Sequence, residues 1–178
     1  MKYRHIRARR RDAVTNYKRR MALLKGGMPR IVIRKTNRRI IAQAVLYSSG
    51  GDKTIAYADS KELAKLGWPS RANTPTAYLT GVLLAKKGKD KINGEAVLDI
   101  GLNKPVKSSV IFAGAKGAID GGIKLLGSIE GDEERIKGGH IAAYSKSGSA
   151  NYAGYKKSGV EVSEIVTLFE DIKKKIMK

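Results

Sequence analysis

The fold is decided by residues 30–60, which read RIVIRKTNRRIIAQAVLYSSGGDKTIAYADS. This stretch holds three short apolar runs, at about 30–36, 39–47 and 53–59, and polar turns separate them. Connections this short join neighbouring antiparallel strands. Because side chains alternate between the two faces of a strand, the pattern predicts one apolar face and one face that mixes arginine and glutamine with aliphatic residues.

A helix and a further strand follow this meander. Thr74 can cap the helix, Pro75 suits its first position, and the Lys86–Lys89 segment ends it. The run EAVLDIGL at 95–102 is typical of a central buried strand. A strand, a helix and a strand in this order imply a parallel crossover.

A second helix is predicted from Ser108 or Ser109 to about Lys124. It contains glycines at positions 114, 117, 121 and 122. Glycine weakens a helix by up to about 1 kcal/mol relative to alanine. We therefore expect the backbone of this helix to approach the sheet or an RNA closely.

The C-terminal third has weaker signals. Residues 132–144 are spaced for a short helix, 145–159 indicate an irregular extended loop, and 163–177 form an amphipathic helix. The sole tryptophan, Trp68, lies in an earlier loop, WPSRAN, where it either anchors that loop against the core or contacts a partner.

The predicted elements define an α/β fold class. Three antiparallel strands, a helix, a parallel strand and a helix outline the ribonuclease H-like motif. We divide the chain into a basic N-terminal arm with a helix (1–28), an α/β core (29–130) and a C-terminal extension with a terminal helix (131–178).

Positive charge is concentrated at the start of the chain. Residues 1–39 hold 15 Lys and Arg and the single acid Asp12, a net charge of +14, so the rest of the chain carries only +6 of the total of +20. Each Lys or Arg placed on a phosphate releases a condensed counterion. The asymmetry therefore predicts a nucleic-acid-binding protein.

The bland alternative is that the arm is a solvated tail. Against it, arginine predominates over lysine between Arg4 and Arg20, and arginine binds phosphate bidentately. Aromatic residues that suit unpaired bases, namely Tyr3, His5 and Tyr17, are interleaved with the charges. Apolar residues at helical spacing also predict a helix from Val14 to Leu24 whose apolar stripe docks on the body.

Composition argues against several other classes. The chain has no cysteine, which excludes disulfides and thiolate metal sites. Its two histidines, His5 and His140, stand far apart, so we expect no metal and no cofactor. No apolar run approaches the roughly 18 to 20 residues that span a bilayer. We expect a cytoplasmic protein with no membrane partner and no self-association.

A nuclease is the enzymatic hypothesis that the predicted topology raises. Nucleases of the ribonuclease H-like motif hold divalent metal with carboxylates on the first and fourth strands and on the intervening helix. Here residues 30–36 and 74–85 contain no acid, and Asp99 alone lies on the fourth strand. One carboxylate amid excess positive charge cannot assemble a two-metal site. We expect no enzyme activity, and Asp99 to be a hydrogen-bonded residue at a strand end.

Several segments carry a family resemblance. They are RRRDAVTNYKRRMALLKGGMPRIVIRKTNRRIIAQ, GWPSRANTPTAYLTGVLLA, EAVLDIGLN, GAIDGGI and GGHIAAY. In order and spacing they resemble the large-subunit ribosomal protein eighteen family, whose members bind 5S ribosomal RNA. The GWPSRAN insert and the chain beyond about residue 130 resemble the archaeal and eukaryotic branch, and the lack of still longer extensions favours an archaeal type.

The resemblance implies a structural constituent of the large ribosomal subunit. Such a protein binds 5S rRNA together with ribosomal protein five and attaches it to the large-subunit rRNA in the central protuberance, beside other large-subunit proteins. The alternative is a non-ribosomal RNA-binding or assembly factor of the same fold.

The resemblance also implies the RNA-binding residues. In the arm they are Arg4, Arg7, Arg9, Arg10, Arg11, Tyr17, Arg19, Arg20 and Lys25. In the first hairpin they are Arg30, Arg34, Lys35, Asn37, Arg38, Arg39 and Gln43. A second tier lies in the loop, at Trp68, Ser70, Arg71 and Asn73. The cations would neutralise phosphates, the amides would bind sugars or base edges, and Tyr17 would stack.

Overall fold

The computed structural model describes residues 6, 8–92, 94–147, 152–156 and 158–178. Its sheet has four strands, in the order β3-β2-β1-β4. They are β1 (Arg30–Lys35), β2 (Ile40–Leu46), β3 (Lys53–Asp59) and β4 (Val97–Asp99). β1 pairs antiparallel with β2 and parallel with β4, and β2 pairs antiparallel with β3. The mixed α/β class and the meander are therefore confirmed.

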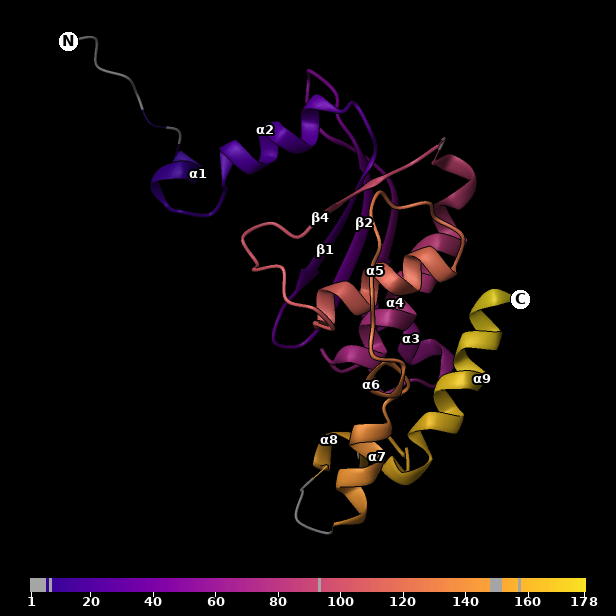
Figure 1. Ribbon diagram of the computed structural model, residues 1–178. Coiled ribbons are helices and arrows are strands. Elements are labelled where there is room, and N and C mark those ends of the chain that lie inside the picture. The colour runs from indigo at the N-terminus through magenta and orange to yellow at the C-terminus, as the bar shows by residue number, and fades with distance from the viewer. Residues whose placement is uncertain (1–5, 7, 93, 148–151, 157) are drawn as a thin grey trace, which may run out of the picture.

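Helices cover one face of this sheet and extend from one end of it (Figure 1). The α-helices are α1 (Ala8–Arg11), α2 (Tyr17–Lys25), α3 (Ser60–Leu63), α4 (Thr74–Gly88), α5 (Val110–Asp120), α6 (Glu133–Lys137), α7 (Gly139–Lys146), α8 (Ala153–Lys156) and α9 (Ile165–Met177). Short 3-10 turns occupy Ala64–Leu66, Lys89–Lys91 and Val162–Glu164.

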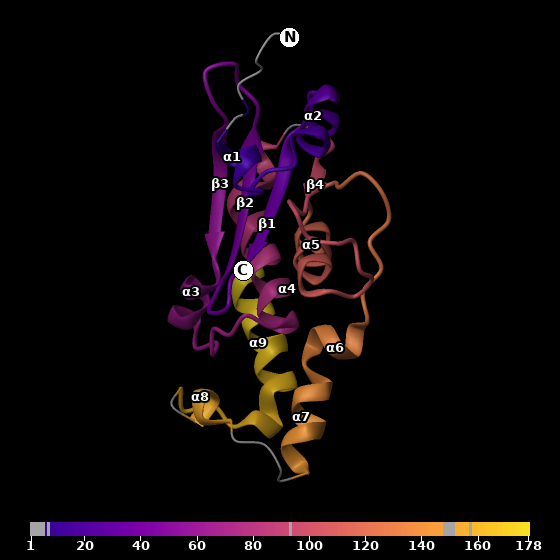
Figure 2. The same ribbon diagram turned by 90° about the vertical axis from the view of Figure 1, so that its left-hand side faces the viewer.

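The two faces of β1 differ as the alternation predicts. Ile31 and Ile33 are fully buried beneath the helices, on the same side as Ala42 and Ala44 of β2. Figure 2 shows the opposite face of the sheet toward the viewer, with α4 and α5 behind it. We call this side of the sheet the open face; from β1 it carries Arg30, Val32 and Arg34, which alternate with the buried isoleucines.

β4 corrects the prediction of a central buried strand at 95–102. The strand covers only Val97–Asp99 and lies at the end of the strand order, with Val97 and Leu98 half-buried. It ends early because the chain turns at Gly101, whose φ is +63°. Beyond it the sheet continues only as an isolated parallel bridge between Ala96 and Leu125.

The glycines of α5 serve helix packing. A Cβ built on Gly117 would fall closer than 3.0 Å to the carbonyl oxygen of Tyr78 in α4, and one built on Gly81 of α4 would fall equally close to the carbonyl of Gly114. The predicted close backbone approach therefore exists, and it is toward α4; an approach to RNA stays a prediction. The helix also ends at Asp120, earlier than predicted, because Gly121 and the positive-φ Gly122 turn the chain.

The C-terminal segment differs in detail from its prediction. The single helix expected at 132–144 is two helices, α6 and α7, because Gly138 adopts φ +88° between them. The expected loop at 145–159 contains the short helix α8. The terminal helix is confirmed, since α9 buries Phe169 against the rings of Trp68 and Tyr78 at centroid distances of 6.1 and 5.5 Å.

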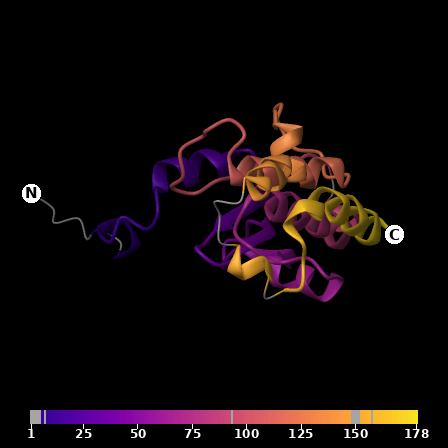
Figure 3. The same ribbon diagram turned by 90° about the horizontal axis from the view of Figure 1, so that it is seen from below.

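The described part of the arm, with α1 and α2, projects from the body on the side of the open sheet face (Figures 1 and 3). Asn16 caps α2 by accepting a hydrogen bond from the Arg19 backbone N–H. None of the α2 side chains is buried, and Val14 and Met21 are 55% and 60% exposed. Tyr17 and Leu24 are half-buried, so the predicted apolar stripe docks on the body only in part, and arginine side chains also hold the helix.

Candidate nucleic-acid interface

Two consecutive arginines fasten α2 to the body. Arg19 Nη1 donates to the backbone carbonyls of Gly101 and Asn103, at 3.1 and 3.3 Å, in the loop after β4. Arg20 Nη2 bonds Asp52 Oδ2, in the turn between β2 and β3, at 2.7 Å. Adjacent residues of a helix point in different directions. The two arginines therefore attach α2 to two different parts of the body, the loop after β4 and the β2–β3 turn.

The contact with Asp52 belongs to a chain of alternating charges. Arg30 bonds Asp52 at 2.6 Å through Nη2 and Asp99 at 3.0 Å through Nη1. Arg34 Nη2 bonds the other oxygen of Asp99 at 2.9 Å. We call Arg20, Asp52, Arg30, Asp99 and Arg34 the arginine–aspartate network. It joins the arm, the β2–β3 turn, β1 and β4.

The network holds both carboxyl groups in their charged form. Burial alone would raise the pKa of Asp99, but the hydrogen bond and charge of Arg34, the Gly101 backbone N–H and the charge of Arg30 outweigh it and hold that pKa below its ordinary value. The pKa of Asp52 is also lowered. Burial alone would raise this pKa, but the hydrogen bonds and charges of Arg20 and Arg30 outweigh the effect of burial. Hydrogen bonds to a carboxylate favour ionisation.

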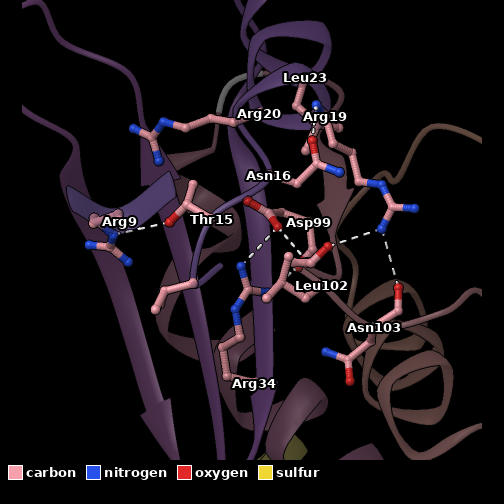
Figure 4. Close-up of a pocket in the computed structure, with 12 residues that line it drawn as sticks. Arg9, Thr15, Asn16, Arg19, Arg20, Leu23, Arg34, Asp99, Leu102 and Asn103 are labelled. Atoms are coloured by element: carbon pink, nitrogen blue, oxygen red, sulfur yellow. Dashed lines mark hydrogen bonds and ion pairs between the residues drawn. The ribbon is translucent and has the colours of Figure 1, made fainter. Parts of the chain in front are cut away.

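A cavity of about 360 Å³ lies between the arm and the sheet. Figure 4 shows Asn16 between Thr15 on one side and Arg19 on the other, with Arg34 and Asp99 below. Leu102, near the centre of the view, and Asn103, to its lower right, come from the loop after β4. A second hollow on the arm side is lined by Tyr17, Met21 and again Leu102, among others.

Several cations near the open face remain available to a polyanion. They have exposed side chains and no ion pair to a described residue. In the arm they are Arg9, Arg10, Lys18, Arg19 and Lys25, and at the β1–β2 turn they are Lys35 and Arg38. Arg11 bonds only Asp12, at 3.6 Å and with both side chains exposed, and such a pair is worth little.

Two of the residues predicted to contact RNA, Arg30 and Trp68, are buried in the structure, which argues against a contact with RNA at these positions. The Arg30 side chain is 2% exposed and engaged by two aspartates. Trp68 is 1% exposed, and its indole Nε1 donates to Thr76 Oγ1 at 2.9 Å. Trp68 therefore anchors its loop in the core, which was one of the two roles considered for it.

Other predicted residues have structural partners. Asn73 Oδ1 accepts from the Thr76 backbone N–H and so caps α4, a role expected of Thr74, while its Nδ2 donates to Tyr155 at 2.6 Å. The Arg71 guanidinium lies against Gly154 of α8. These two residues tie the loop to the C-terminal extension.

The remaining predicted contacts lie on the open face or at its edges. Arg39 bonds Asp59 at 3.2 Å with its side chain 41% exposed. Asn37 is exposed at the turn, Gln43 is half-buried on β2, and Ser70 Oγ donates to Ser60. Two arm residues of the prediction, Arg4 and Arg7, lie outside the described residues, as do Tyr3 and His5.

The sequence analysis missed Asp52, Lys18 and the Leu102–Asn103 loop. A signal existed for Asp52, which is the first acid after Asp12 in a stretch crowded with arginine. An isolated carboxylate in such a stretch is attracted to the surrounding cations. Leu102 carried no comparable signal, since only the fold brings it beside the arm.

Metal and membrane chemistry find no support in the described part of the chain. It holds no group of three or more His, Cys, Asp or Glu that could bind a metal ion. Asp99 is a hydrogen-bonded strand-end residue, as expected. His140 is half-buried, and burial together with the charge of Arg135 lowers its pKa. None of the described helices combines the length and apolarity needed to cross a bilayer.

A small α/β domain with a cationic arm has the electrostatic features of polyanion-binding proteins. The family model described as "Ribosomal large subunit proteins 60S L5, and 50S L18" matches residues 1–96. The chain is also 42% identical over 177 residues to "Large ribosomal subunit protein uL18" of Korarchaeum cryptofilum (strain OPF8), covering 94% of this chain and 91% of the relative. The chain belongs to the uL18 family of large-subunit ribosomal proteins. It is a structural component of the ribosome and not an enzyme.

Proposed function

We propose that this protein binds 5S rRNA and attaches it to the large-subunit rRNA in the central protuberance, next to ribosomal protein five. The observation that carries the proposal is the position of the free cations. The arm holds exposed cations that no described carboxylate neutralises, and Arg19 and Arg20 keep its helix in a fixed place on the body.

The cations form two groups at opposite ends of β1. The arm precedes the strand at Arg30, and the β1–β2 turn with Lys35, Asn37 and Arg38 follows its other end. A strand of six residues is about 20 Å long at roughly 3.3 Å per residue. Two cationic groups at that separation suit a protein that holds two RNA segments together.

The contacts we propose are the accessible residues among those predicted. Phosphates would be neutralised by Arg9, Arg10, Arg11, Arg19, Lys25, Lys35, Arg38 and Arg39, and Asn37, Gln43 and Tyr17 would contact sugars or bases. We add Lys18 to this set. Arg20 and Arg34 act through the arginine–aspartate network, by holding the arm and the sheet edge in place.

The strand order supports a finer description of the fold. β1 and β4 are parallel, α4 connects β3 to β4, and α5 packs against α4. We propose that this order of strands and helices corresponds to the ribonuclease H-like motif, which serves here as a scaffold. Arg30 and Arg34 engage the carboxylate of Asp99, which in a nuclease of this motif would face metal.

Salt dependence of binding tests the proposal. We expect the full chain to bind transcribed 5S rRNA more tightly than an unrelated structured RNA of equal length, with log affinity falling linearly with log KCl. The triple variant Arg9→Ala, Arg10→Ala, Arg11→Ala should reduce that slope by about two to three, since each lost phosphate contact removes about 0.7 to 0.9.

A charge-matched control separates contact from net charge. Lys174, Lys175 and Lys178 lie exposed at the C-terminal end, far from the arm (Figure 1). Replacing these three by alanine removes the same charge and should leave the slope nearly unchanged. Equal slopes for the arm variant and the wild type would remove the arm from the interface, and equal affinity for both RNAs would contradict the choice of 5S rRNA.

A further inference from the structure

The cavity between the arm and the sheet is lined by exposed apolar side chains as well as by arginines. Val14 and Leu102 line it, and each is 55% exposed. They come from segments far apart in the chain, which Arg19 brings together by bonding Gly101 and Asn103. Large apolar side chains held in the open among arginines indicate a ligand with both an apolar surface and negative charge.

Polar groups of defined direction lie beside these apolar walls. The Oδ1 of Asn16 is used by the α2 cap, which leaves its Nδ2 donors without a described partner. The Nδ2 of Asn103 donates to the Ile100 carbonyl, which leaves its Oδ1 acceptor without one. Arg9 bonds Thr15 only through Nε, so both of its terminal nitrogens remain available for a phosphate.

A nucleotide matches this combination of groups. Its base offers an apolar face and hydrogen-bonding edges, and its phosphate carries the negative charge. A cavity of about 360 Å³ lies at the small end of the roughly 300–1,000 Å³ range of small-molecule sites. It is suited to one nucleotide and is too small for an RNA helix.

We propose that this cavity binds one unpaired nucleotide of the bound RNA, with its base between Val14 and Leu102 and its phosphate on Arg9. The proposal rests on the RNA-binding function proposed above and names the part of the RNA that the arm recognises. The arginine–aspartate network shapes the site beforehand, because Arg34 and Asp99 form its floor while Arg20 holds the arm over it.

An uncharged substitution tests the base contact. Leu102→Ala should weaken 5S rRNA binding about fivefold or more, as loss of an apolar contact to a base does. The salt slope should stay at its wild-type value, since no phosphate contact is lost. Leu126→Ala is the matched control, because Leu126 is 54% exposed and does not line the cavity; it should leave the affinity unchanged.

Cross-linking identifies the occupant directly. The chain has no cysteine, so Leu102→Cys and Leu126→Cys each offer a single thiol for a short photoreactive probe. With 5S rRNA bound, the probe at position 102 should modify one or two adjacent unpaired nucleotides, mapped by reverse-transcription stops. Because Leu102 is exposed, thermal unfolding of both variants should match the wild type.

The possible outcomes separate the two proposals. Cross-links from position 102 to paired nucleotides, or none at all while the RNA is bound, would overturn the nucleotide site and leave RNA binding intact. So would a label at position 102 in reconstituted large subunits that modifies a neighbouring polypeptide and no RNA. If the wild type shows no preference for 5S rRNA, the proposed function itself fails, whatever the cross-links show.

Discussion

At the scale of single residues, Asp99 holds together elements that are distant in sequence. It accepts bonds from Arg30, from Arg34 and from the Gly101 backbone N–H. Arg30 is almost wholly buried, and a buried charge that loses its partner is costly. The carboxylate thus has a structural role, which is to join β1 to β4 and the loop that follows it.

Replacing this carboxylate should destabilise the fold. We expect Asp99→Asn to lower the free energy of unfolding by about 3 kcal/mol, since it leaves Arg30 buried with one carboxylate fewer. Urea unfolding followed by circular dichroism measures the effect. Asp12→Asn is the control, because Asp12 is 57% exposed on its side chain and its pair with Arg11 is long; its effect should stay within about 0.5 kcal/mol.

The dependence of stability on pH gives a second measure of the contribution of the Asp99 carboxylate. The pKa of Asp99 is lower in the folded protein than its ordinary value of 3.8. An unfolded chain therefore takes up the proton at a higher pH than the folded one, so this stabilisation is present near neutral pH and is lost as the pH falls through the folded pKa. The Asn variant should lose less stability between pH 5 and pH 2 than the wild type, and equal losses would contradict the role given to Asp99.

At the scale of elements, the packing of α4 on α5 depends on glycine. Gly117 and Gly81 bring the two backbones closer than any side chain would allow. The same residues weaken the helices that contain them, by about 1 kcal/mol each relative to alanine. The close contact offsets that cost, because tightly packed atoms gain dispersion energy collectively.

Adding one methyl group at this contact should destabilise the fold. We expect Gly117→Ala to cost about 3 kcal/mol or more of unfolding free energy, because the Cβ would meet the backbone of Tyr78, which cannot move aside easily. Gly50→Ala is the control: nothing lies within 4 Å of the added Cβ there. A stabilised Gly117→Ala variant would show that helix propensity outweighs the contact. Thermal melts of both variants decide it.

Elements whose hydrophobic pattern lies within their own segment could be predicted from the sequence. Element ends that depend on contacts or backbone angles outside that pattern could not. The alternating runs of the meander and the apolar stripe of α9 both lie within their own segments, and both predictions are confirmed. The end of β4 depends on a turn at Gly101 that lets Arg34 pack against it. The break at Gly138 depends on a positive φ that composition alone does not reveal.

At the scale of the whole molecule, the charge count predicted the cationic N-terminal region but not what each of its arginines contacts. Arg19, Arg20 and Arg30 look alike in sequence, yet one bonds backbone carbonyls, one reaches Asp52 and one is buried between two aspartates. For Arg30 the environment arises from the register of β1 beside β4, which places Asp99 between Arg30 and Arg34. Long-range register is not readable from local spacing.

The C-terminal extension closes the core of the sheet domain. Phe169 of α9 is 1% exposed and contacts Trp68 and Tyr78, both of which precede β4. Ile165, Ile172 and Ile176 are buried in the same cluster. The α/β body and the C-terminal extension therefore share one hydrophobic core, although the sequence suggested a division near residue 130.

This shared core predicts that the body and its extension unfold together. Trp68 is the only tryptophan, so its fluorescence reports the contact, while far-ultraviolet circular dichroism reports the whole chain. We expect the two signals to change at the same urea concentration and Phe169→Ala to lower the unfolding free energy by about 3 to 5 kcal/mol. Met177→Ala, at a residue 58% exposed on the same helix, should have little effect. Fluorescence that changes well before the dichroism would instead establish the extension as a separate unit.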